Sequence, residues 1–204
     1  SKDESGDTYN EIDILTIKLC DGLLYGVPLA LINRLEEFPK DSFQLSSGKR
    51  LVKYGDNAME VLDLNKFLKL DNIMVAKEGN EEKVTVFACV FNFQGTYYSF
   101  DVDEIIDISR IPSQLDLGVK KEGLLGSSFI DDEFIQIFDV HNLFNIGKVE
   151  SNINSGQNRN ILLAEDSAFY RKIQEDLLLE NGFLVHSFPN GKLALEEFTN
   201  NHKK

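Results

Sequence analysis

Two adjacent carboxylates, Glu165 and Asp166, are the residues of this chain best suited to chemistry. They follow the apolar run ILLA at 161–164, which is typical of a buried strand in a parallel sheet. Carboxylates at the carboxyl end of such a strand lie where open α/β sheets bind their ligands. Two such groups together suit a hard divalent cation such as Mg²⁺, which favours oxygen ligands. A polar strand end that happens to be acidic would explain the same residues.

The elements that must position this pair follow it directly in the chain. A helix-like segment at 167–182 comes first, and a second short strand pattern, FLVHSF, follows at 183–188. The turn PNG at 189–191 then leads into a second helical pattern at 192–200. We therefore expect the order strand, helix, strand, helix, with both carboxylates in the first connection.

This order and the wording ILLAEDS…LLLENGFLVHSFPNGKLALEEF resemble the opening of a response-regulator receiver domain, over 160–200. The resemblance implies an α/β flavodoxin-like fold in which Glu165 and Asp166 hold Mg²⁺ for phosphoryl transfer. A Glu in the first place differs from the more usual Asp. The chain ends at Lys204, before the family's phospho-accepting Asp, so we assign no phosphoacceptor and expect an incomplete receiver. In such a fragment Mg²⁺ binding would be weak or absent, and exposed apolar faces would favour mobility or self-association.

The charge of the chain is unevenly distributed. The net charge is −13, and residues 151–204 carry 6 Lys or Arg against 7 Asp or Glu, which leaves −12 for residues 1–150. An acidic body of this kind repels phosphates, which excludes a nucleic-acid-binding protein. It would serve solubility or select basic partner surfaces. No segment approaches the roughly 18 uninterrupted apolar residues that a membrane helix needs.

The other reactive residue types form no site. Cys20 and Cys89 lie in the apolar runs LTIKLC and VFACVF, and we interpret them as small buried hydrophobes. The three histidines are scattered without ligand spacing, so none is given a role: His141, His186 and His202. The N-terminal segment is acidic and unlike a signal peptide. Because it does not begin with Met, we expect the chain to be a piece of a longer protein.

The first 145 residues contain an internal repeat. Residues 20–39 align with 93–112 at a shift of 73, and residues 59–68 align with 135–144 at a shift of 76. The matched positions keep their residue type and include Gly22/Gly95, Tyr25/Tyr98, Pro39/Pro112, Val61/Ile137 and Asp63/Asp139. A difference in loop length would explain the change of shift.

Each copy of the repeat has the pattern of short β-strands. LTIKL, VTVFACVF, YYSFDV and FIQIFDV are rich in Val, Ile, Phe and Tyr, and the turn signals DG, GDN, QG and DD separate them. Because closure removes unpaired edges, this pattern favours two small barrels over one open sheet. The segments NKFLKL and HNLFNI are predicted to be single helical turns that cap the copies.

The duplicated pattern resembles the CheW-like fold, a pair of SH3-like five-stranded β-barrels, over about residues 10–146. Four phrases carry the resemblance: DGLLYGVPLALINRLEEFP, RLVKYGDNAMEVLDLNKFL, VDEIIDISRIPSQL and GLLGSSFIDDEFIQIFDVHNLF. We therefore expect a mainly β protein with an α/β receiver fragment at its C-terminal end. Its parts are a polar tail at 1–10, the CheW-like domain at 11–146, a flexible linker at 147–159, and a truncated receiver at 160–204. The linker is rich in Asn, Ser and Gly, which cannot bury enough apolar surface to order it.

A CheW-like domain joined to a receiver resembles two known arrangements. One is a hybrid CheA chemotaxis histidine kinase, and the other is a CheV-type coupling protein without a kinase core. The phrase YGVPLALINRLEEFP looks more like the kinase regulatory domain. The resemblance implies a cytoplasmic signalling scaffold associated with membrane receptor arrays. Its implied partners are a CheW-like coupling protein and the tip of a chemoreceptor.

We assign no catalytic residue and expect no enzymatic activity, because the kinase's ATP-binding boxes and phosphorylatable His do not occur in this chain. An enzyme that uses Mg²⁺ at Glu165 and Asp166 is an alternative, but no positioned nucleophile accompanies the pair. A purely structural double barrel with an unrelated tail is another. Apolar strand residues are core by default, so the sequence identifies no interface residues.

Overall fold

The structure is a computed structural model that describes residues 11–70, 84–118, 121–144 and 160–201. The expected tail at 1–10 and linker at 147–159 lie outside these ranges. The chain divides into two compact units. The first, which we call the β body, consists of residues 12–111 and 115–144, and the second includes residues 160–201, which we call the C-terminal unit.

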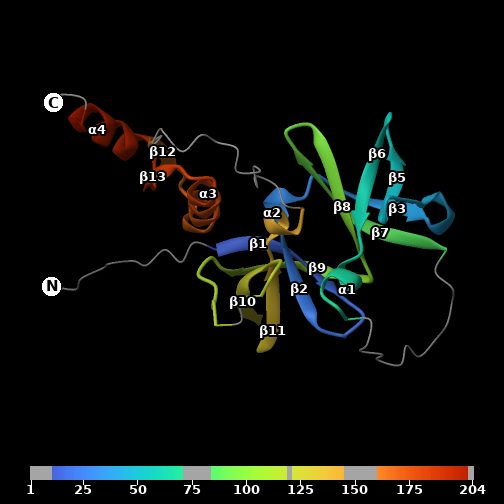
Figure 1. The fold of residues 1–204 in the computed structure, drawn as a ribbon. Helices are drawn as coiled ribbons and strands as arrows, with labels where there is room; N and C mark the ends of the chain where they lie inside the picture. The colour runs from blue at the N-terminus through green and yellow to red at the C-terminus, as the bar shows by residue number, and fades with distance from the viewer. Residues whose placement is uncertain (1–10, 71–83, 119–120, 145–159, 202–204) are drawn as a thin grey trace. The chain divides into compact units, whose positions relative to one another are not determined.

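The β body consists of two sheets and two short helices (Figure 1). The five-stranded sheet has the order β10-β11-β2-β1-β9, with the bounds Leu124–Ile130, Glu133–Phe138, Leu24–Pro28, Glu11–Lys18 and Glu104–Pro112. The six-stranded sheet has the order β3-β7-β8-β6-β5-β4, with the bounds Arg34–Pro39, Thr85–Phe93, Thr96–Val102, Asn57–Leu62, Lys49–Tyr54 and Gln44–Ser46. The 3₁₀ turns are η1 (Leu29–Leu31) and η2 (Lys40–Ser42).

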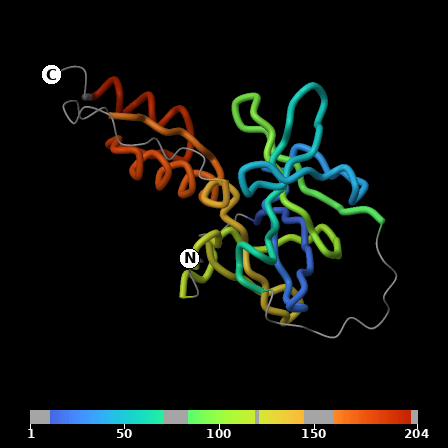
Figure 2. The backbone as a smooth tube through the Cα atoms, turned by 45° about the vertical axis from the view of Figure 1, so that its right-hand side comes forward, coloured from blue at the N-terminus to red at the C-terminus, as the bar shows by residue number. Residues whose placement is uncertain are grey.

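The internal repeat is confirmed, and the two copies exchange strands. The first two strands pair with the last ones, and Figure 2 shows the yellow chain of β10 and β11 returning to the blue chain of β1 and β2. Gln136 lies opposite Tyr25 in the parallel pair β11–β2, and Glu60 lies opposite Tyr98 in the parallel pair β6–β8. Shifts of 76 and 73 convert one pair into the other.

The predicted helical turns are also confirmed. α1 spans Leu64–Phe67 and α2 spans Val140–Leu143, each directly after the strand that the repeat predicts. Asp63 and Asp139 cap them by accepting from the backbone N–H groups of Lys66 and Asn142, both at 3.0 Å. Both copies of the repeat therefore have an aspartate at this position because it caps the helical turn that follows.

The expectation of closed barrels was wrong, because neither strand order closes on itself. In the six-stranded sheet the two edge strands, β3 and β4, are consecutive in the chain and joined by η2. In the five-stranded sheet a single bridge between Asp116 and Ser127 connects the chain after β9 to β10. Pro39 and Pro112 end the equivalent strands β3 and β9, and neither can donate to a continued ladder. In both sheets the chain that follows one edge strand thus turns across the opening toward the other edge strand.

One large apolar core unites the two sheets. It contains buried side chains of β1, β2, β7, β8, β10 and β11 together with residues of both helical turns, among them Ile17, Tyr25, Cys89, Phe91, Phe100, Phe138, Leu64 and Leu143. A smaller cluster inside the six-stranded sheet consists of Val52, Met59, Val61 and Val90. Because the large core draws on both copies, neither copy can bury its apolar face alone.

The C-terminal unit has the predicted order of strand, helix, strand and helix. β12 (Asn160–Ala164) and β13 (Leu184–Phe188) are parallel, and α3 (Ala168–Glu180) and α4 (Gly191–Asn201) follow them. Ser167 caps α3 by accepting from the N–H of Tyr170. Phe169 on α3 is buried, whereas Leu162 and Leu184 on the strands are exposed.

Candidate functional site

The acidic pair lies where the sequence predicts it, after the last residue of β12. Ala164 lies opposite Phe188 in the parallel ladder, and the N–H of Glu165 donates to the carbonyl of Phe188 at 3.1 Å. Both carboxylates therefore sit at the carboxyl ends of two parallel strands. Glu165 is half-buried and Asp166 is exposed.

The turn that carries the pair is held by hydrogen bonds from the start of α3. The N–H of Ser167 donates to Glu165 Oε1 at 3.1 Å and to Asp166 Oδ1 at 2.9 Å. Arg171 Nη1 donates to the carbonyls of Glu165 at 2.6 Å and Asp166 at 3.4 Å. Sequence reasoning missed Arg171, although its position four residues after the helix cap indicates that it faces back toward this turn.

The pair has the right chemistry for part of a Mg²⁺ site. Its oxygens are hard ligands, and Mg²⁺ is commonly held by one or two carboxylates while it keeps several waters. Within the described ranges, however, no group of three or more His, Cys, Asp or Glu side chains is placed to hold a metal. The residues present therefore fit a hydrated cation held by two carboxylates and do not form a closed metal centre.

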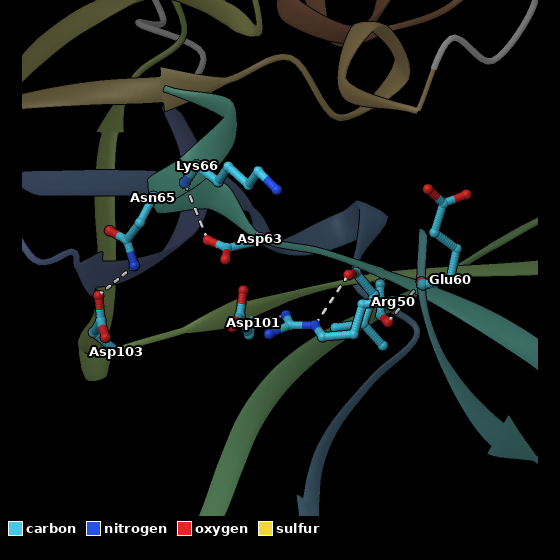
Figure 3. A network of polar contacts seen from close by, with 9 residues as sticks. Arg50, Glu60, Asp63, Asn65, Lys66, Asp101 and Asp103 are labelled. Atoms are coloured by element: carbon cyan, nitrogen blue, oxygen red, sulfur yellow. Dashed lines mark hydrogen bonds and ion pairs between the residues drawn. The ribbon is translucent and has the colours of Figure 1, made fainter. Parts of the chain in front are cut away.

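A second polar constellation lies in the β body, around Arg50 (Figure 3). Its Nη2 lies 2.8 Å from Asp101 Oδ2, its Nε donates to the carbonyl of Val61 at 3.4 Å, and its guanidinium lies 5.0 Å from the centre of the Phe43 ring. The two charged groups are close, but their contact does not have the alignment of a hydrogen bond. Asp101 Oδ1 and Arg50 Nη2 are both buried, and neither has a hydrogen-bond partner. Burial raises the pKa of Asp101 and outweighs the opposing effect of Arg50. The pair fastens β5 to β8 across β6.

Other perturbed groups in the β body are structural. Burial raises the pKa of Cys89 to about 12, so its thiol stays protonated and unreactive. Burial and a hydrogen bond to Asp21 raise the pKa of Tyr25. Cys20 is half-buried, and its Sγ lies 3.9 Å from the carbonyl of Leu70. The interpretation of Cys89 as a small hydrophobe is thus confirmed by its burial.

The structure separates core from surface where the sequence did not. Leu35 on β3 and Phe87 on β7 share a face with the buried Cys89, because Leu35 lies opposite Cys89 and Phe87 opposite Glu37. Leu35 is nevertheless 46% exposed and Phe87 is 40% exposed. A second exposed apolar pair, Phe129 and Phe134, faces across the β10–β11 hairpin with ring centres 5.8 Å apart. Paired apolar side chains at the surface are typical of sites where a partner docks.

Comparison with known proteins shows a likeness in fold. No protein-family model matches the chain, and no curated protein matches it in sequence. The crystal structure of the scaffolding protein TtCheW from Thermoanaerobacter tengcongensis is similar, with 17% identity and a TM-score of 0.50. The similarity covers 67% of this chain and 94% of that protein's chain. That share of the chain has a CheW-like fold. In the parts of the chain that the structure covers, no helix is long and apolar enough to cross a membrane.

Proposed function

We propose that this chain is a scaffold of chemotaxis signalling, the CheW-like regulatory region of a hybrid CheA histidine kinase. The observation that carries the proposal is the exchange of strands between the two copies of the β body, in a chain whose fold is similar to that of a CheW scaffolding protein. In this role the chain couples the kinase to a CheW-like coupling protein and to the tip of a chemoreceptor. It acts in the cytoplasm beside receptor arrays and has no catalytic activity of its own.

The C-terminal unit is proposed to be the first two strand–helix units of a receiver domain. Its parallel strands and the carboxylates at their ends support this assignment. Glu165 and Asp166 would hold Mg²⁺, which supplies positive charge for phosphoryl transfer when it is bound. Arg171 would keep the turn in place through the two carbonyls that it contacts. A CheV-type coupling protein also combines these two parts, and it is the alternative.

The docking surface is proposed to include Leu35 and Phe87. Both are partly exposed beside the core that unites the sheets, so a partner can bury them without unfolding the β body. Interface cores are less charged than the surrounding surface, which fits this apolar pair. The acidic charge of the chain would favour a partner with a basic rim.

A binding assay of the whole chain tests the proposal, with a CheW-like coupling protein and a receptor signalling fragment as partners, at low and high salt. We expect binding that survives high salt, and we expect Leu35→Arg to weaken it about tenfold or more. The matched control is Leu45→Arg, since Leu45 is 84% exposed on β4 and lies outside the pair. Absence of binding to either partner would refute the scaffold role.

A further inference from the structure

Strand β9 forms one end of the five-stranded sheet and, among the strands that the structure describes, is paired on one side. On that side it faces β1. Arg110 Nε lies 2.9 Å from Asp13 Oδ1, and Thr16 Oγ1 lies 3.0 Å from Ser109 Oγ. The opposite edge of β9 has no paired strand in the sheet order of the described residues.

The backbone of this outer edge is occupied by a side chain of β9 itself. The N–H of Ile108 donates to Asp107 Oδ1 at 2.7 Å. Because the N–H and C=O groups of a strand alternate between its two edges, residues 104, 106, 108 and 110 direct theirs outward. The carboxylate of Asp107 thus stands where the carbonyl of an added strand would be.

The centre of this strand exposes apolar side chains. Ile106 is 45% exposed and Ile108 is 56% exposed, and they lie two residues apart, on one face of the strand. Exposed β-branched residues on an unpaired edge favour the addition of another strand. Proteins restrain such edges with charged side chains, and Asp107 lies between the two isoleucines.

The sequence of β9 complements itself in one antiparallel register. With Asp107 on the twofold axis, Ile106 of one copy lies opposite Ile108 of the other, and Glu104 lies opposite Arg110. These four residues are the ones that direct their backbone groups outward. The same register therefore forms the backbone hydrogen bonds and brings the matching side chains opposite one another. Arg110 can exchange its bond to Asp13, because both side chains of that pair are largely exposed.

We propose that the outer edge of β9 is a pairing site for a second copy of this chain and that Asp107 restrains it. In the paired state the two Asp107 side chains face each other in a position without direct hydrogen bonds, with Cα atoms about 4.5 Å apart. Like charges so placed oppose pairing. Each carboxylate also gives up its bond to the N–H of Ile108, which passes to the carbonyl of Ile106 in the second copy. Neutralising Asp107 therefore releases the edge. This inference does not depend on the proposed function.

Sedimentation velocity of the whole chain over a range of concentrations tests the restraint. We expect Asp107→Asn to dimerise with a dissociation constant about tenfold lower than that of the wild type. Asp132→Asn is the matched control, since it removes the same charge from the β10–β11 turn, and it should behave as the wild type does. Adding Ile108→Arg to Asp107→Asn should abolish the dimer. A monomeric Asp107→Asn variant would overturn the proposal.

Oxidative cross-linking tests the register. Asp107→Cys places two thiols on the twofold axis at a separation that suits a disulfide. Glu104→Cys is exposed on the same strand, but its two thiols would be about 20 Å apart in this register. We expect rapid disulfide dimers from Asp107→Cys alone. A dimer of Asp107→Asn combined with equal cross-linking of both cysteine variants would assign the contact to another surface and refute pairing through β9.

Discussion

Gly26 and Ser99 occupy equivalent positions in the two copies of the repeat, yet their cross-strand partners differ in size. Gly26 lies opposite Ile137, and Ser99 lies opposite Val61. A Cβ atom on Gly26 would lie 2.6 Å from Ile137 Cδ1 and 2.8 Å from Ile14 Cδ1. Ser99 is fully buried, and its hydroxyl donates to the carbonyl of Glu60 at 3.1 Å. In one copy the small residue Gly26 leaves room for the larger Ile137, and in the other the larger Ser99 is paired with the smaller Val61.

The copies also differ in charge. Arg50 and Asp101 form the partly buried ion pair of the six-stranded sheet, while the equivalent positions in the five-stranded sheet are Gly126 and Pro28. The backbone does not require charge at these positions. The ion pair therefore belongs to one copy only. Removing either residue would leave the other charge buried without its partner.

The helical turns show a third difference. Asn65 on α1 donates to Asp103 Oδ2 at 2.9 Å and accepts from the N–H of Cys20 at 3.2 Å. Its equivalent on α2 is His141, whose ring lies 4.9 Å from that of Phe93. One turn is fastened by hydrogen bonds of an amide and the other by aromatic packing of an imidazole, so the second turn contains a histidine that can be protonated.

The largest effect on stability is expected from removing one member of the Arg50–Asp101 ion pair, which only one of the two copies contains. Arg50→Met leaves Asp101 without its partner among buried groups and should lower the free energy of unfolding by about 2–3 kcal/mol. Replacing both residues, as in Arg50→Met/Asp101→Leu, should recover most of that loss, because no buried charge is left unpaired. Urea unfolding measures both. Lys49→Met, in an exposed ion pair with Glu60, should change stability by less than about 1 kcal/mol, and a similar loss there would contradict the argument.

Gly26→Ser makes the first copy resemble the second at one position only. We expect a loss of about 2 kcal/mol, because the added atoms overlap two isoleucine side chains in a packed core. Gly26→Ser/Ile137→Val copies the pair of the other sheet and should be more stable than Gly26→Ser alone. Thermal unfolding of the three proteins checks this order. If the double variant proved less stable than Gly26→Ser, volume would not be the cause of the difference.

The smallest effect is expected at His141. Burial lowers its pKa, against the opposing effect of Asp139. The unfolded chain then binds a proton at a higher pH than the folded chain, so stability is complete above the ordinary pKa of about 6.5 and falls as the pH drops below it. The urea midpoint should therefore decrease between about pH 7 and pH 5.5, and His141→Asn should reduce that decrease. His186→Asn, in the C-terminal unit, serves as the control and should leave the slope for the β body unchanged.

The predictions that held are those with local causes. The turn dipeptide Gln94-Gly95 and the pair Asp131-Asp132 both adopt positive φ in two-residue hairpins, as the turn signals indicated. The two short helical turns and the order of elements after Asn160 followed from short patterns in the same way. The acidic pair was placed correctly because its position depends only on where β12 ends. The proposed metal at that pair, and the receiver to which it would belong, stay predictions.

The sequence by itself determined the strands, the turns and the short helical turns, since each depends on residues within a few positions of one another, and the repeat showed that these local patterns occur twice. Only the tertiary structure decided that β2 pairs with β11 and β8 with β6, and that the sheets stay open. β2 is short and buried on both faces, so apolar side chains of either copy could cover it, and its partner is decided by the summed burial of the whole core. For the same reason Cys89 is buried while Leu35, directly opposite it, is exposed.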